Sequence, residues 1–138
     1  MRRFALVLSA VFAAGALGGL ANSLVVWWFG HAGWSQALGV HIAPPLAKYW
    51  LYQRMIWGGI WGGLFILPMA PGKWVLRGLI FSLGPSAVTL LYLMPHAGAR
   101  YFGLAHGALT PLMVLFFNAV WGVVASGWLK YSRAPLSS

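Results

Sequence analysis

Residues 4–29, FALVLSAVFAAGALGGLANSLVVWWF, carry no charged side chain. At 1.5 Å of rise per residue, about 20 consecutive apolar residues let a helix cross the ~30 Å hydrocarbon core of a bilayer. This stretch is longer than that, and we therefore predict that it is a transmembrane helix. It decides the fold class, because the same pattern returns along the rest of the chain.

Further apolar stretches predict three more membrane-spanning helices. Proline and glycine residues separate them, and Pro85 interrupts the third predicted helix near its middle, where a kink is expected. The sequence thus predicts an all-α, integral membrane four-helix bundle that forms a single domain over residues 1–131, followed by a short cytoplasmic tail at 132–138. The predicted helices lie at about residues 4–29, 49–69, 75–94 and 108–129.

The first outer loop, residues 30–48, is too long for a simple turn. Trp34, Leu38 and Ile42 recur in it at four-residue spacing, which is typical of one face of a helix. The prolines that follow end the pattern. We predict a short interfacial helix in this loop, with its apolar face in the headgroup region.

Lys and Arg side chains are divided unevenly between the two ends of the predicted bundle. Cytoplasmic loops of membrane proteins carry the excess of basic residues, which here predicts that both termini are cytoplasmic. The short loops and this bias favour a bacterial inner membrane. The side of the termini carries Arg2, Arg3, Lys73, Arg77, Lys130 and Arg133, and the other side carries Lys48, Arg54 and Arg100.

The composition excludes most enzyme chemistry. Hydrophobic residues make up 61% of the 138 residues and charged residues only 7%, whereas soluble domains carry roughly a quarter of charged residues. Asp, Glu and Cys are absent from the sequence. Carboxylate acid–base pairs, thiolate nucleophiles and thiolate metal sites are therefore missing, and we expect a protein that is not an enzyme.

The net charge of +9 has no counter-charge within the sequence. Anionic membrane lipids, anionic solutes or an acidic partner subunit must supply it. Nucleic acid is not expected as a partner, because the basic residues are scattered singly rather than clustered.

Small residues recur at four-residue spacing on the predicted helices. They let backbones approach closely, which matters in lipid, where no hydrophobic effect drives helix association. We predict that these positions pack helices together, within the bundle or between protomers, and the alternative is that they line a pore. The positions are Gly15, Gly19, Gly58, Gly62, Gly122 and Ser126.

The second and fourth predicted helices share a pattern, since RMIWG at residues 54–58 matches NAVWG at residues 118–122. One interpretation is an internal repeat of two helical hairpins related by an axis along the membrane normal. The other is chance matching among helices rich in glycine and tryptophan.

Polar side chains are predicted at one depth within the membrane. Counted at 1.5 Å per residue, Asn22, Ser23, Arg54 and Thr89 all fall about 8 Å outside the midplane. The sequence offers no carboxylate to Arg54, so an anion, either a solute or a lipid phosphate, fits its guanidinium group and the neighbouring amide and hydroxyl groups. The alternative is that Arg54 snorkels to the outer headgroups.

A second polar layer is predicted near the midplane. The sequence Gly84-Pro85-Ser86 breaks the hydrogen-bond ladder of the third predicted helix, and Asn118 lies at a similar depth. The freed backbone groups need partners from neighbouring helices, water or a ligand. Such breaks mark substrate sites in transporters, although proline kinks that serve packing alone are commoner.

All four histidines, His31, His41, His96 and His106, are predicted at or outside the outer ends of the helices. Imidazoles gathered at one face can ligate copper, zinc or haem, or sense external pH. No pair has a tight ligand spacing, and no carboxylate exists to orient a ligating ring. No metal site or cofactor is predicted on this basis, and haem and copper stay open as alternatives.

The leading functional hypothesis is a non-catalytic polytopic membrane protein that acts by assembly. It would be a small accessory subunit of a larger membrane complex, or a homo-oligomer packed through its Gly-rich faces, and it would bind acidic lipid. The first alternative is a channel or transporter for a small anion or neutral solute that uses the outer Arg/Asn/Thr site. The second alternative is a redox subunit with haem or metal on the outer histidines.

Overall fold

The computed structural model describes residues 2–133, and every regular element within that range is a helix. Three helical stretches are long and apolar enough to cross a membrane: α1 (Arg2–His31), the stretch Trp74–His96, and α6 (Thr110–Tyr131). They correspond to the first, third and fourth predicted helices. The prediction of an all-α chain is confirmed for the part of the chain that the structure describes.

The second predicted helix, residues 49–69, is different, and a bundle of four long helices is not confirmed. The α-helix α3 covers only Lys48–Trp61, and a tighter 3₁₀ helix, η1, continues it over Gly62–Ile66. Glycines lower the stability of an α-helix, and Pro68 disfavours helical backbone at the residue before it. Leu67 is accordingly extended, with φ −69° and ψ 134°.

The third predicted helix changes its geometry along its length. The α-helix α4 (Trp74–Val88) contains Pro85, passes into a π-helix, η2 (Thr89–Leu93), and ends in the short α5 (Met94–His96). Pro85 has no N–H, and its ring crowds the carbonyl group one turn earlier, so it interrupts the regular ladder. The wider π turns begin at Thr89, four residues after Pro85, and such turns inside α-helices are frequent at functional sites.

The first outer loop contains a single helical turn, α2 (Trp34–Ala37), so the helix predicted to reach Ile42 is wrong beyond Ala37. The turn ends because Gly39 adopts a left-handed φ of 75°, a conformation that commonly terminates helices. The four-residue spacing of apolar residues therefore does not reflect a continuous helix in this loop.

The two outer loops are joined to each other. The second of them contains the 3₁₀ helix η3 (Tyr101–His106). The backbone N–H of His41, in the first loop, donates to the carbonyl group of His106 at 2.8 Å. This bond fixes the outer end of the first helix pair to that of the second.

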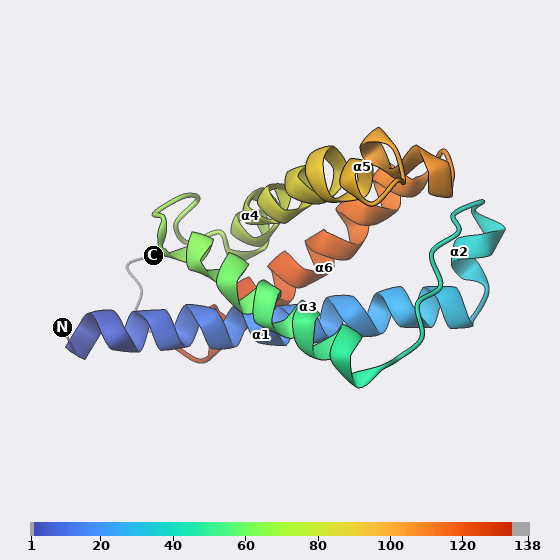
Figure 1. Cartoon of the computed structure of the whole chain (residues 1–138). Helices are drawn as coiled ribbons and strands as arrows, with labels where there is room; N and C mark the ends of the chain where they lie inside the picture. The colour runs from blue at the N-terminus through green and yellow to red at the C-terminus, as the bar shows by residue number, and fades with distance from the viewer. Residues whose placement is uncertain (1, 134–138) are drawn as a thin grey trace.

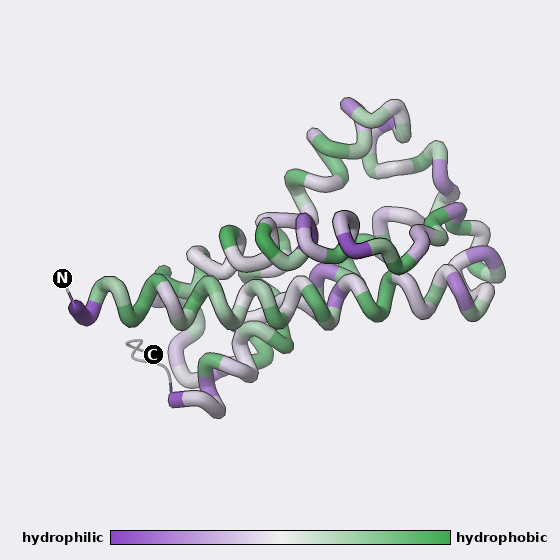
Figure 2. Tube along the Cα trace, turned by 60° about the horizontal axis from the view of Figure 1, so that its bottom comes forward, coloured by the Kyte–Doolittle hydropathy of each residue, from purple (hydrophilic) through white to green (hydrophobic). Residues whose placement is uncertain are grey.

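The helices are arranged as two antiparallel pairs (Figure 1). α3 packs along α1, α6 packs along α4, and α1 and α6 then pack against each other and join the pairs. α3 and α4 have no comparable contact. The start of α1 and the end of α6 lie toward one end of the molecule, and the outer loops lie at the other. Figure 2 shows that hydrophobic residues dominate α1 after its hydrophilic first turn.

Glycines bring α1 and α3 into backbone contact. A Cβ placed on Gly58 would lie 2.7 Å from the carbonyl oxygen of Gly15, and one placed on Gly19 would lie 2.7 Å from the carbonyl oxygen of Arg54. A Cβ on Gly62 would overlap the carbonyl oxygen of the facing α1 backbone. The small residues predicted on these two helices therefore pack against one another within one chain.

The second pair, α4 and α6, uses the same kind of contact. A Cβ placed on Gly78 would lie 2.5 Å from the carbonyl oxygen of Gly122. One turn further along α6, the Ser126 hydroxyl donates to the carbonyl group of Trp74 at 2.6 Å. Both helix pairs are thus held by small residues that allow close approach of their backbones.

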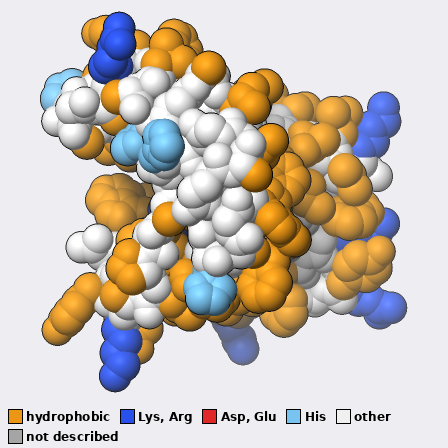
Figure 3. Space-filling model, turned by 90° about the vertical axis from the view of Figure 1, so that its right-hand side faces the viewer, with side chains coloured by type: hydrophobic (Ala, Val, Ile, Leu, Met, Phe, Trp, Pro, Cys, Tyr) orange, Lys and Arg blue, Asp and Glu red, His pale blue; other side chains and the backbone are white. Residues whose placement is uncertain are grey.

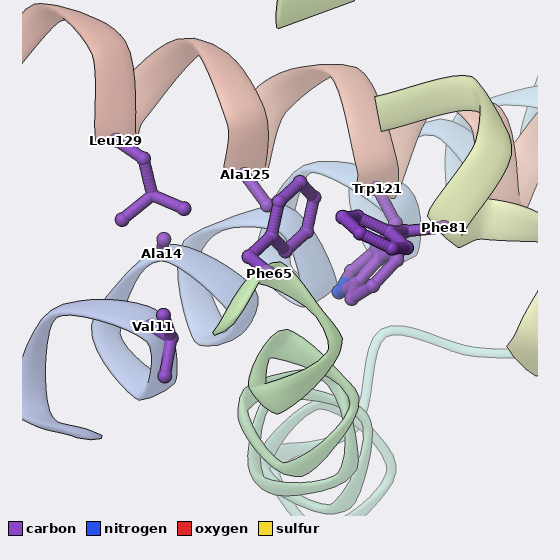
Figure 4. Packing of buried hydrophobic residues seen from close by; sticks show 7 residues of the cluster. All are labelled: Val11, Ala14, Phe65, Phe81, Trp121, Ala125 and Leu129. Atoms are coloured by element: carbon purple, nitrogen blue, oxygen red, sulfur yellow. The ribbon is translucent and has the colours of Figure 1, made fainter. Parts of the chain in front are cut away.

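The larger apolar core lies where the two pairs meet (Figure 4). The ring of Phe65, in η1, meets the Phe81 ring edge-on at a centroid distance of 4.9 Å. The indole N–H of Trp121 donates to the carbonyl groups of Gly15 at 3.0 Å and Gly58 at 3.3 Å, which fixes α6 to both helices of the other pair. The cluster consists of Val11, Ala14, Phe65, Phe81, Trp121, Ala125 and Leu129.

One basic side chain, Arg77 in the first turn of α4, is buried. Its guanidinium group donates to the carbonyl group of Phe65 and, at 3.4 Å, to that of Met69. The Phe65 carbonyl group lies in the last turn of η1 and the Met69 carbonyl group in the non-helical segment after it, where no further helical turn supplies N–H donors. Arg77, which the sequence identified only as one of the basic residues near the termini, therefore anchors the end of η1 to α4.

Candidate binding cleft

A cavity of about 550 Å³ lies between α3 on one side and α4 with η2 on the other. α1 and α6 contribute Asn22, Asn118 and Trp121 to its wall, and we call it the α3–η2 cleft. It occupies the position where α3 and α4 lack the close contact that α1 and α6 make. Its lining comprises Asn22, Trp50, Gln53, Arg54, Trp57, Gly58, Trp61, Pro85, Val88, Thr89, Tyr92, Leu93, Asn118 and Trp121.

The cleft opens sideways between α3 and η2. Trp57, Tyr92 and Leu93 line it, and they are 61%, 57% and 53% exposed, respectively. Side chains that line a cavity and are also exposed mark its mouth. The mouth is therefore mostly apolar and aromatic, with the exposed amide of Gln53 beside it, and the less exposed side chains of Arg54, Asn22 and Asn118 lie further inside.

Arg54 turns inward from α3 and is held by α1. Its Nε donates to the Ser23 hydroxyl oxygen at 2.9 Å, and its Nη2 donates to Oδ1 of Asn22. The guanidinium carbon also lies 4.9 Å from the centre of the Trp50 ring, a cation–π contact. The guanidinium group is thus held by protein groups within the bundle, whereas a snorkelling side chain would end among the lipid headgroups.

The groups that hold Arg54 are themselves fixed by hydrogen bonds. Asn22 is buried, and its Nδ2 donates to the carbonyl group of Phe117 in α6 at 2.6 Å. The Ser23 hydroxyl donates to the carbonyl group of Gly19 at 2.6 Å, so toward Arg54 it can only accept. Arg54 is therefore positioned by a network that reaches from α3 through α1 to α6.

Arg54 keeps donors for a ligand. A guanidinium group has five N–H donors, and within residues 2–133 its Nη1 donates to no protein acceptor. The sequence contains no carboxylate that could neutralise it. Because Arg54 lines the cleft, the cleft presents an uncompensated positive charge with free donors to whatever enters it.

A second polar pair lies on the opposite wall. The Asn118 amide nitrogen donates to the Ser86 hydroxyl oxygen at 3.1 Å, and the Ser86 hydroxyl donates to the carbonyl group of Ser82 at 2.8 Å. Arg54 and Ser23 have the same arrangement. In both pairs, the serine hydroxyl donates to the carbonyl group one turn earlier in its own helix and accepts a hydrogen bond from a side chain of the second helix of the hairpin. Asn118 faces the cleft, and Ser86 lies buried behind it.

The structure gathers the predicted site residues around one cavity. Arg54, Asn22, Thr89, Pro85 and Asn118 line the cleft. Ser23 and Ser86 lie behind the lining and support it through the hydrogen bonds described above. The two polar layers that were predicted at separate depths thus face the same space.

The aromatic lining supplied by α3 was not identified from the sequence as part of a site. Trp50, Arg54, Trp57 and Trp61 follow one another at steps of three or four residues, and Gln53 directly precedes Arg54. This period places them on one face of a helix. That spacing is the signal in the sequence that could have identified this lining.

The histidines do not form a cluster. Within residues 2–133, no three side chains of His, Cys, Asp or Glu lie together in a way that could hold a metal ion. His31 stacks on Trp27, and His96 stacks on Tyr92 at a centroid distance of 4.1 Å. In Figure 3, which faces the end with the outer loops, histidine side chains appear at separate places. The redox alternative therefore gains no support from this geometry.

The chemistry available in the cleft is recognition of an anion beside an apolar surface. Arg54 supplies charge and directional donors, amide and hydroxyl groups supply neutral hydrogen bonds, and tryptophan rings supply apolar area. No protein-family model, curated protein or solved structure matches this chain.

Proposed function

We propose that this chain is a non-catalytic integral membrane protein that binds an acidic lipid in the α3–η2 cleft. The lipid phosphate would bind Arg54, and an acyl chain would leave through the lateral mouth. The observation that carries the proposal is the inward guanidinium group of Arg54, which faces the cleft with free donors in a sequence without carboxylates.

The polar part of the cleft favours a phosphate. A phosphate oxygen pair matches the fork of a guanidinium group, and such charge-assisted hydrogen bonds are about twice as strong as neutral ones. Ser23 and Asn22 already occupy Nε and part of Nη2. The ligand would therefore bind through the remaining donors, and the network behind Arg54 would hold the guanidinium group in place for it.

The mouth of the cleft favours an amphiphile over a free anion. If α1, α4 and α6 span the membrane, the sideways mouth between α3 and η2 faces lipid. Its exposed rim of Trp57, Tyr92 and Leu93 offers apolar contact to an acyl chain. A soluble anion would gain nothing from that rim.

The proposal also states in which membrane the protein lies and which side its termini face. We propose a bacterial inner membrane with both termini in the cytoplasm, on the basis of the larger number of basic residues at the end where α1 begins and α6 ends. In that orientation, Arg54 lies in the outer half of the bilayer. The acidic lipid would then come from the outer leaflet.

The test compares Arg54→Gln with Arg100→Gln, because each removes one positive charge from the same end of the molecule. Arg100 is exposed in an outer loop and does not line the cleft. We expect Arg54→Gln to weaken binding of phosphatidylglycerol at least about tenfold, since a charge-assisted bond is lost. Arg100→Gln should bind as the unaltered protein does. Native mass spectrometry of the purified protein with added lipid measures both.

Equal retention of phosphatidylglycerol by the two variants would contradict the proposal. So would equal binding of phosphatidylglycerol and phosphatidylcholine by the unaltered protein. Displacement of the bound lipid by soluble glycerol phosphate at equal concentration would show that the headgroup alone is the ligand, which contradicts the role given to the apolar mouth.

A second candidate function is transport, and the specific observation that favours it is the repeated polar pair. The pairs Ser23–Arg54 and Ser86–Asn118 have the same hydrogen-bond pattern on the two helix hairpins, and the cleft lies between the hairpins. Substrate sites of many transporters lie at such a repeat interface. We therefore include the two-hairpin repeat in the proposal, with the lipid or its anionic headgroup as substrate.

If the protein transports lipid, a fluorescent acidic lipid should move between the two leaflets of proteoliposomes that contain the purified protein, and the rate of this movement is measured. Arg54→Gln should reduce this rate to that of protein-free liposomes, because the charged headgroup loses its binding site. Arg100→Gln should retain the full rate. An unaltered protein that leaves the rate at the protein-free level would exclude transport and leave lipid binding intact.

Assembly with a second copy or another membrane subunit remains part of the proposal. Gly15, Gly58 and Gly122 are engaged within one chain, so a partner would pack on other surfaces. The mass of the native complex, extracted with its lipids, tests this part, and a single-chain mass would contradict it.

A further inference from the structure

The amide group of Asn118 has one orientation that its neighbours dictate. Ser86 has a single hydroxyl hydrogen, and it donates this hydrogen to the carbonyl group of Ser82 at 2.8 Å. Toward Asn118, Ser86 can therefore only accept. The Asn118 atom that lies 3.1 Å from the Ser86 oxygen must be the donor, Nδ2. The amide oxygen, Oδ1, is consequently turned away from Ser86.

That oxygen is an acceptor without a protein donor. Among residues 2–133, no N–H or O–H group donates to Oδ1 of Asn118, and the atom keeps accessible surface. Asn118 lines the cleft, so a ligand there can reach it. Asn22 differs, because Arg54 and the carbonyl group of Phe117 engage both atoms of its amide.

An acceptor in this position calls for a ligand that donates a hydrogen bond. The two common donors of lipid headgroups are ammonium and hydroxyl groups. An ammonium group would be repelled by Arg54 in the same cleft, and the sequence has no carboxylate to offset that repulsion. A hydroxyl group donates without charge.

Two other neutral polar side chains line the same cleft. Thr89 contributes a hydroxyl group from η2, and Gln53 contributes an amide group from α3. Each of them can both donate and accept, which is what a group with several hydroxyls requires. Neither has a side-chain hydrogen bond to a residue within 2–133.

From these contacts we infer that the α3–η2 cleft selects anionic lipids whose headgroup carries a free hydroxyl, such as a glycerol phosphate diester. The phosphate binds Arg54, and the headgroup hydroxyl donates to Oδ1 of Asn118. This inference rests on the proposed function, because it assumes that a lipid phosphate occupies Arg54. It specifies which class of headgroup the cleft prefers, and it predicts tighter binding of acidic lipids with hydroxyl groups than of acidic lipids with amines.

The experiment compares phosphatidylglycerol with phosphatidylethanol of the same acyl chains. Both are phosphodiesters with one negative charge, and only phosphatidylglycerol carries hydroxyls. Competition between the two for the purified full chain is measured by native mass spectrometry. We expect phosphatidylglycerol to be preferred about three- to tenfold, the ratio that one hydrogen bond provides. Phosphatidylserine, which carries an ammonium group, should bind less tightly than phosphatidylglycerol.

Asn118→Leu is the matched variant, since it removes the acceptor and keeps a side chain of similar size. We expect it to lose the preference for phosphatidylglycerol, so that the ratio of its affinities for phosphatidylglycerol and phosphatidylethanol falls to about one. Equal binding of the two lipids by the unaltered protein overturns the inference. A preference that survives in Asn118→Leu overturns it as well.

These outcomes are separate from those of the proposed function. If both acidic lipids bind through Arg54 without a preference between them, the headgroup inference fails and the proposed function stands. If neither acidic lipid binds better than phosphatidylcholine, both fail.

Discussion

Gly62→Ala is expected to lower the free energy of unfolding by about 3 kcal/mol or more and to separate α3 and η1 from α1. The added Cβ would overlap the carbonyl oxygen of Val11 and lie 3.1 Å from the Cα of Gly15. Both neighbours are backbone atoms, so no change of rotamer can relieve the overlap. Chemical unfolding of the purified protein in detergent micelles measures the effect.

The neighbouring residue provides the control. A Cβ placed on Gly63 would meet nothing within 4 Å, and alanine favours helical backbone over glycine by about 1 kcal/mol. Gly63→Ala is therefore expected to be as stable as the unaltered protein or slightly more stable. If the two variants unfold at the same denaturant concentration, the close approach of α1 and η1 is not what holds this pair together.

Asn22→Leu is expected to destabilise the protein by about 3 kcal/mol and to weaken acidic-lipid binding at least about tenfold. Asn22 is 4% exposed and links three helices, since it accepts from Arg54 of α3 and donates to the carbonyl group of Phe117 in α6. Leucine fills the same space but removes the hydrogen bonds to the Arg54 guanidinium group and to the Phe117 carbonyl group. The lipid loses affinity because the guanidinium group is no longer held in position.

A double-mutant cycle measures the interaction energy between Asn22 and Arg54 separately from their contacts with other residues. Asn22→Leu, Arg54→Met and the double variant are unfolded under the same conditions. We expect the double variant to be more stable than the sum of the single effects predicts, by about 1–2 kcal/mol, because it contains no guanidinium N–H that has lost its amide acceptor. Strictly additive effects would show that the two side chains do not act on each other. Ser9→Ala, at an exposed serine of α1, serves as the control.

The sequence predicted α1, α4 and α6 well and α3 poorly, for a physical reason. Apolar length alone marks a helix that can span a bilayer, and three stretches satisfy this criterion. The stretch that begins at Lys48 contains paired glycines and ends in Pro68, so its backbone tightens into η1 and then becomes extended. Composition does not reveal such a change of helix type.

The candidate site was predictable in its parts but not in its arrangement. A count along the helices placed Asn22, Ser23 and Arg54 at one depth, and the structure joins them by hydrogen bonds. The same count gave Asn118 and Pro85 a separate layer, yet they line the same cleft. Depth fixes only one of three coordinates, and the direction in which each side chain points depends on helix rotation and packing.

By itself, the sequence determined the helical class, the long apolar helices and the absence of carboxylate and thiol chemistry, because these follow from composition and local periodicity. Only the tertiary structure decided that Arg54 turns inward and that a cleft remains between α3 and η2. The indole N–H of Trp121 bonds α6 to α1, whereas within residues 2–133 no side-chain hydrogen bond joins α3 to α4. Which pair of helices closes is set by contacts between residues far apart in the chain, and local sequence does not encode them.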